Sequence, residues 1–123
     1  MPDTEYVINM EPIFSTLERF DVDEIVARVD EPWWNQTLIR IGDDLVRLGV
    51  FEGEYHWHKH DDQDEFFFVL EGAVRIELEG RDPVELKKHQ GFSVPKGLKH
   101  RPVVPTRATV LMIEKASIVP TGD

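Results

Sequence analysis

Residues 53–72 read GEYHWHKHDDQDEFFFVLEG and combine the two strongest patterns in the chain. The first is an alternation of histidines, at His56, His58 and His60, followed by an acidic loop and Glu65. Every second side chain of a β-strand points to the same face, so the three imidazoles are expected to project together. The second pattern is the apolar run Phe66–Leu70, which predicts a strand that is covered on both faces.

The clustered histidines predict a metal site. Three adjacent imidazoles gain little on a surface strand, and a core strand would have to bury them without partners. A metal ion resolves this difficulty because imidazole is a common ligand of first-row divalent ions. The chain has no cysteine, so such a site must use nitrogen and oxygen ligands. A calcium site at Asp61, Asp62 and Asp64 is disfavoured because the spacing lacks the calcium-loop pattern.

Short strand-like runs separated by turns fill most of the chain and predict an all-β sandwich or barrel. A short N-terminal helix is expected before them, with Asn9 as its cap and Pro12 in its first turn. The apolar stripe of this helix would consist of Met10, Ile13, Phe14, Leu17 and Phe20. The predicted strands are Ile25–Val29, Gln36–Ile41, Leu45–Phe51, Tyr55–His60, Glu65–Leu70, Val74–Glu79, Val84–Leu86, Phe92–Val94, Pro102–Val104 and Ala108–Glu114.

The length of 123 residues predicts one domain, residues 1–123, with an N-terminal arm over 1–35 and the barrel over 45–115. A formal net charge of −10 disfavours nucleic acid and anionic membrane surfaces as partners. The acidic start at Met1–Asp3 has no basic flank or apolar segment, which predicts no secretory signal and a cytoplasmic protein. Two runs without a polar face, Phe66–Leu70 and Val110–Ile113, need a cover, either the N-terminal segment or a second subunit, and a homodimer is predicted.

Two spacings carry a family resemblance. His58-x-His60-x4-Glu65-x6-Gly72 resembles the first motif of the cupin superfamily, and Pro95-x-Gly97-x2-His100 resembles the second. The residues around them are most similar to small single-domain cupins described as mannose-6-phosphate-isomerase-like, and Thr121-Gly122-Asp123 resembles the C-terminal residues of that group. The resemblance implies a cupin-type double-stranded β-helix, which is a jelly-roll barrel.

The resemblance also implies a ligand set for one divalent transition metal ion per chain, which would be Fe, Mn, Ni, Co or Zn. The implied ligands are His58, His60, Glu65 and His100. Three neutral imidazoles and one carboxylate leave two positions of an octahedral ion open for water or substrate.

The implied function is that of a metal-dependent enzyme acting on a small polar metabolite of unknown identity. Both isomerisation of a sugar or keto compound and dioxygenation at Fe(II) are compatible with the ligand set. The alternative is a non-catalytic module that binds a metal or a small molecule. His56 shares the ligand face by parity and is the candidate acid–base group or ligand-supporting group, against a plain pocket-lining role. Phe67 and Val69 share parity with Glu65 and are candidate pocket walls.

The chain departs from the family pattern at positions that form turns or support the ligands. Glu52 stands where the first motif begins with glycine, and Gly53 follows one position late. His89 stands where a glycine is usual in the second motif, and Gln90 stands where an acid is common. Val104 replaces an asparagine. These differences weaken the transfer of a specific reaction more than they weaken the metal site.

Overall fold

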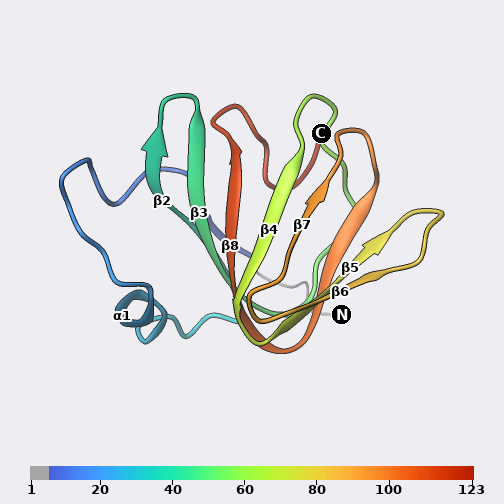
Figure 1. The fold of residues 1–123 in the computed structure, drawn as a ribbon, viewed down its shortest axis with the longest axis horizontal. Coiled ribbons are helices and arrows are strands. Elements are labelled where there is room, and N and C mark those ends of the chain that lie inside the picture. Colours follow the sequence, from blue (N-terminus) through green and yellow to red (C-terminus); the bar gives the residue numbers. More distant parts are fainter. Residues whose placement is uncertain (1–5) are drawn as a thin grey trace.

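The computed structural model describes residues 6–123, and residues 1–5, the start of the predicted arm, lie outside the described residues. Its elements are β1 Val7–Asn9, α1 Val22–Val26, β2 Trp33–Ile41, β3 Asp44–Glu54, β4 Glu65–Glu71, β5 Ala73–Leu78, β6 Val84–Lys87, β7 Gly91–Val94 and β8 His100–Lys115. The strands are hydrogen-bonded in the order β1-β2-β3-β8-β4-β7, and β5 joins through β8 and pairs with β6 (Figure 1). The fold is the all-β jelly roll that the sequence predicts.

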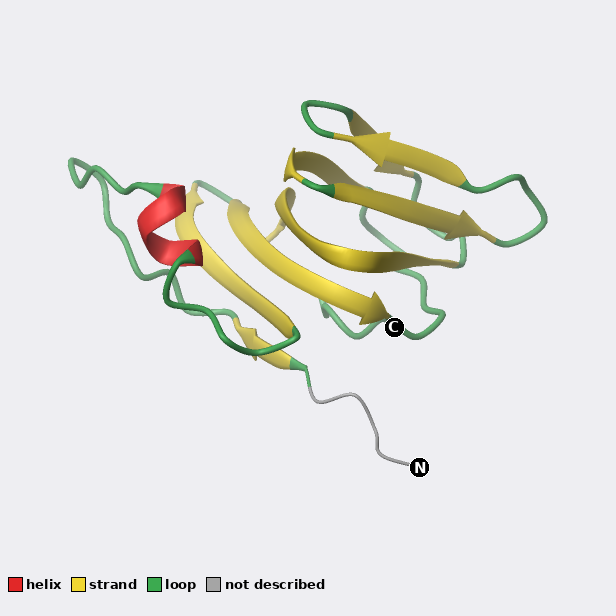
Figure 2. Ribbon diagram, turned by 90° about the horizontal axis from the view of Figure 1, so that it is seen from below, coloured by secondary structure: helices red, strands yellow, loops and turns green. Residues whose placement is uncertain are grey.

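The long strand β8 connects the two parts of the sheet. Its first residues pair with β5, where His100 lies opposite Leu78, and its later residues pair with both β3 and β4. The runs Pro102–Val104 and Ala108–Glu114, predicted as two strands, are therefore parts of one. Figure 2 shows the strands curving around a common interior, with α1 beside β2. Within residues 6–123, no helix has the length and apolar composition needed to cross a bilayer.

The alternation along β4 separates an inner face from an outer one. Phe67 and Val69 point inward and are buried, whereas Phe66 and Phe68 are only partly covered. On the neighbouring strand β8, Ile113 is 42% exposed on the same outer side. The predicted homodimer would cover this surface, and it stays a prediction. The inner residues join a core cluster that also contains Trp33, Phe51, Tyr55, Val74, Ile76, Leu78, Leu86, Val94, Val104, Ala108, Val110 and Met112.

The predicted helix over residues 10–20 is wrong. Asn9 ends β1, which pairs in parallel with β2, and the chain beyond it is irregular. The backbone amide of Phe14 donates a hydrogen bond to the carbonyl of Leu38 at 2.9 Å, so this segment lies along β2 instead of bonding within a helix. Leu17 has a φ of 71°, which interrupts any right-handed helix. Tertiary bonding to the sheet thus outweighs the helical apolar spacing.

The strand predicted at Ile25–Val29 is also wrong, because the helix α1 covers its first half. Asp21 caps α1, and its side chain accepts a hydrogen bond from the amide of Glu24 at 3.1 Å. This arrangement of an N-cap acid followed three residues later by glutamate is a recognised helix start.

Two departures from the family pattern have a structural explanation. Gly53 has a φ of 109° and lies at a register shift between β3 and β8, so the one-residue displacement is absorbed by a bulge. His89 has a φ of 68°, the left-handed region that glycine adopts without strain. The turn between β6 and β7 therefore keeps a glycine-like backbone although the side chain is an imidazole.

Candidate metal centre

The first two candidate ligands are brought together by a single antiparallel bridge. The segment Tyr55–His60, predicted as a strand, is irregular except at His58, which pairs with His100. The amide of His58 donates to the carbonyl of His100 at 3.0 Å, and the reverse bond measures 2.8 Å. Opposed residues of such a bridge project to one side, and the two imidazole centroids lie 4.4 Å apart.

His60 and Glu65 complete the cluster from the two ends of the acidic loop. The carbonyl of His60 accepts a hydrogen bond from the amide of Gly97 at 2.8 Å, which fixes this segment against the turn before His100. Gly97 has a φ of 81°, and this turn requires it. Glu65 begins β4 and points inward, in step with Phe67. The loop itself is used structurally, since Asp64 accepts a hydrogen bond from the Lys96 amide at 2.9 Å.

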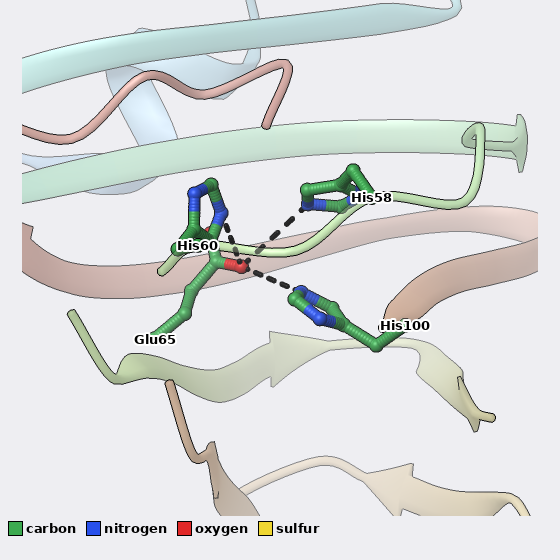
Figure 3. Close-up of side chains that lie close together, drawn as sticks. All are labelled: His58, His60, Glu65 and His100. Atoms are coloured by element: carbon green, nitrogen blue, oxygen red, sulfur yellow. Dashed lines mark hydrogen bonds and ion pairs between the residues drawn. The ribbon is translucent and has the colours of Figure 1, made fainter. Parts of the chain in front are cut away.

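Three imidazole nitrogens surround one carboxylate oxygen (Figure 3). The Nε2 atoms of His100, His60 and His58 lie 2.9, 3.3 and 3.9 Å from Glu65 Oε1. One donor atom from each of the four residues lies within 4.8 Å of all the others, and all four residues are buried. Ligands bound at about 2.1 Å to one ion are separated by about 3–4 Å, so this spacing suits a single ion.

Two of the imidazoles are held in the form that a metal needs. Nδ1 of His58 donates to the carbonyl of His56 at 3.0 Å, and Nδ1 of His100 donates to the carbonyl of Leu98 at 2.9 Å. A carbonyl can only accept, so the proton of each neutral ring is on Nδ1 and the lone pair is on Nε2. Such bonds orient metal-ligating histidines and raise their basicity.

Missing hydrogen-bond partners in the cluster also agree with a bound metal ion. Both ring nitrogens of His60 are buried and have no hydrogen-bond partner within residues 6–123. Buried polar atoms without partners are rare and call for a bound ion, water or other ligand. Burial lowers the pKa of His58, which favours its neutral, metal-binding form. Burial alone would raise the pKa of Glu65, but the contacts with His100, His58 and His60 hold it well below its usual range.

A buried arginine–glutamate pair lies next to Glu65 of the cluster. Arg47 is fully buried, with Nη1 3.7 Å from Oε2 of Glu114. Arg47 also donates from Nε to the Thr37 hydroxyl at 2.9 Å and from Nη2 to the Asn9 carbonyl at 3.1 Å. Burial, together with the negative charge of Glu65, raises the pKa of Glu114 well above its usual value. The sequence patterns did not single out this pair.

His56 does not join the four candidate ligands. Its side chain is exposed, and Nε2 lies 2.7 Å from the carbonyl of Thr121. Its backbone carbonyl supports the ring of His58, as described above. The acid–base role of its imidazole stays a prediction. Tyr55, by contrast, is buried against the site, and its hydroxyl donates to the Pro120 carbonyl at 3.1 Å.

A small cavity of about 20 Å³ lies beside the cluster, which is room for about one water molecule. His58 and Glu65 form its polar wall. Phe67, a predicted pocket wall, does line it, whereas Val69 belongs to the core and is not among the lining residues. The other lining residues are Trp33, Asn35, Phe51, Tyr55, Pro102, Met112 and Pro120.

Fold and site together define a class: a small jelly-roll protein with a buried three-histidine, one-carboxylate cluster that could hold a metal ion. The family model described as Cupin domain matches residues 45–114. The chain belongs to the cupin family. The uncharacterized protein YdbB of Bacillus subtilis (strain 168) is 39% identical over 90 residues, which cover 73% of this chain and 80% of the relative.

Solved structures show the same fold. A cupin-2 domain containing protein from Shewanella frigidimarina NCIMB 400 is similar with a TM-score of 0.73 and 26% identity, covering 78% of this chain and 93% of that one. The hydroquinone 1,2-dioxygenase of Sphingomonas sp. TTNP3, solved with 4-hydroxybenzoate bound, is similar with a TM-score of 0.72 and 18% identity. That match covers 83% of this chain and 33% of the dioxygenase, and it concerns the fold alone.

Proposed function

We propose that this chain is an enzyme that depends on one divalent transition metal ion held by His58, His60, Glu65 and His100. The observation that carries the proposal is the convergence of three buried Nε2 atoms on one carboxylate oxygen. A bound ion would polarise an oxygen atom of a substrate or take part in oxygen chemistry, as the metal identity allows. Fe, Mn, Ni, Co and Zn all suit three imidazoles and one carboxylate.

The proposed substrate is a small polar metabolite. An isomerase acting on a sugar or keto compound and an Fe(II) dioxygenase are the two reaction classes that the ligand set supports. The backbone carbonyls of His56 and Leu98 keep two ligand rings in place, while Phe67 and Tyr55 line the adjoining cavity. The exposed imidazole of His56, whose ring centroid is 5.4 Å from that of His58, is the nearby group proposed to move a proton.

One observation favours a second candidate, a non-catalytic metal-binding module. All four residues of the cluster are buried, and the adjoining cavity has room for about one water molecule. A protein that only holds an ion needs no larger space. An enzyme, in contrast, must admit its substrate by a local movement.

Turnover by the metal-loaded protein separates the two candidates. The protein is loaded separately with Fe(II), Mn(II), Ni(II), Co(II) and Zn(II) and mixed with panels of hydroxybenzoates, keto acids and sugars. Oxygen uptake and NMR detection of isomerised product are the readouts. The enzyme proposal expects turnover with at least one ion, which is lost in the variant His58→Ala/His60→Ala. Stoichiometric binding without turnover for every ion would favour the binding module.

A further inference from the structure

A short segment near the end of the chain crosses directly over the ligand-bearing segment. Residues 119–123, here named the strap, follow the buried Ile118 and turn back through a hydrogen bond from the Gly122 amide to the Val119 carbonyl, 2.8 Å long. The hydrogen bonds of its last residue place the strap against the segment that carries His58 and His60.

Four hydrogen bonds attach the strap to residues 55–61. The first two, described above, run from the side chains of Tyr55 and His56 to carbonyls of the strap. The amide of Asp123 donates to the Lys59 carbonyl at 2.9 Å, and the Asp61 amide donates to Oδ2 of Asp123 at 2.6 Å. Lys59 lies between two ligands in the sequence, so the strap is fastened to the backbone that carries them.

Gly122 permits the closest approach of the strap to the cluster. A Cβ atom at this position would lie 2.6 Å from Cβ of His58 and 3.3 Å from the carbonyl oxygen of Lys59. The first distance is shorter than real Cβ contacts, and the φ of 99° also disfavours any residue with a side chain. A larger residue at position 122 would consequently force the strap away from His58.

We propose that the strap is a gate over the metal centre, and that it must move for anything larger than a water molecule to reach the ligands. Pro120 of the strap forms part of the wall of the 20 Å³ cavity, next to His58 and Tyr55. The four attachments are hydrogen bonds, and two of them involve exposed side chains, so the strap is held less firmly than the core. The gate rests on the proposed function, since it controls access to the metal.

Metal exchange kinetics test the gate with Gly122→Val. Wild type and variant are loaded with Co(II), whose absorption reports occupancy, and both uptake and extraction by EDTA are followed in time. We take the strap to be open in at most about a tenth of wild-type molecules. A variant whose strap is always open is then expected to take up and release Co(II) about tenfold faster or more. Because a gate affects entry and exit equally, the dissociation constant is expected to stay unchanged.

Gly80→Val is the matched control. Gly80 also has a positive φ, of 73°, but a Cβ there meets nothing within 4 Å, so this variant carries the backbone strain without touching the strap. Its exchange rates are expected to equal those of the wild type. Asp123→Ala, which removes the bond to the exposed Asp61, is a second variant that disturbs only the surface and should raise both rates in the same direction.

The outcomes separate the gate from the metal site. Unchanged rates in Gly122→Val, or in Asp123→Ala if the first variant does not fold, would overturn the gate and leave the metal site intact. Faster release without faster uptake would also overturn it, since the strap would then hold the ligands and not control access. A wild type that binds no Co(II) would overturn the proposed function together with the gate.

Discussion

His60→Ala is expected to lower the affinity of the protein for divalent metal ions by at least about 100-fold, because changes of residues that only support ligands already cost 10–100-fold. His60 is 2% exposed, and its Nε2 lies 3.3 Å from Glu65 Oε1, in the centre of the cluster. Both its ring nitrogens are without a hydrogen-bond partner among the described residues, which leaves Nε2 free to bind the proposed ion. Competition with a chromophoric chelator measures the affinity.

The control for this prediction is His89→Asn, which removes an imidazole far from the cluster. His89 is exposed in the turn between β6 and β7 and has a φ of 68°. Asparagine tolerates this left-handed conformation better than alanine does, so the turn is preserved. The control is expected to bind metal like the wild type. Equal affinities for His60→Ala and wild type would refute the assignment of His60 as a ligand.

Arg47→Ala is expected to lower the free energy of unfolding by about 3–5 kcal/mol, because it removes a fully buried side chain and leaves buried acceptors without their donor. Arg47 is 0% exposed, and its loss leaves Thr37 Oγ1 and the carbonyl of Asn9 without their donor. It also removes the positive charge that faces the buried acids Glu114 and Glu65. Denaturant unfolding of the metal-free protein measures the change.

A double variant serves as the control for the charge effect. Arg47→Met/Glu114→Leu replaces both partners with apolar side chains of similar size, and such replacements of buried pairs are often neutral or stabilising. We expect it to be more stable than Arg47→Ala, although it has two substitutions. If Arg47→Ala lost less than about 1 kcal/mol, an ordinary value for a point mutation, the pair would not stabilise the barrel as proposed.

Much of the site was predictable because its pattern is local. The alternation at His58 and His60 and the short loop before Glu65 keep three candidate ligands within a few residues of one another. The proximity of His100 came from the family resemblance, since no local pattern pairs it with His58. The same alternation did not bring the His56 imidazole into the cluster, because the chain there is not a regular strand and His56 Nε2 lies against the Thr121 carbonyl.

The features that sequence patterns missed depend on distant pairing. Arg47 meets Glu114 only because β3 and β8 pair in a particular register, and composition does not distinguish it from the other arginines. The helix over residues 10–20 failed because the Phe14 amide bonds to β2, which apolar spacing does not report. Asp21 and Glu24 were a readable signal for the true helix.

The metal content of freshly purified protein tests the central claim most directly. Wild type and His58→Ala/His60→Ala are purified side by side without chelators, and elemental analysis measures the transition metals in each. We predict a stoichiometric divalent metal in the wild type and background levels in the double variant. Equal metal contents in the two proteins, or a wild type that stays metal-free even after reconstitution with each of the five ions, would contradict the account.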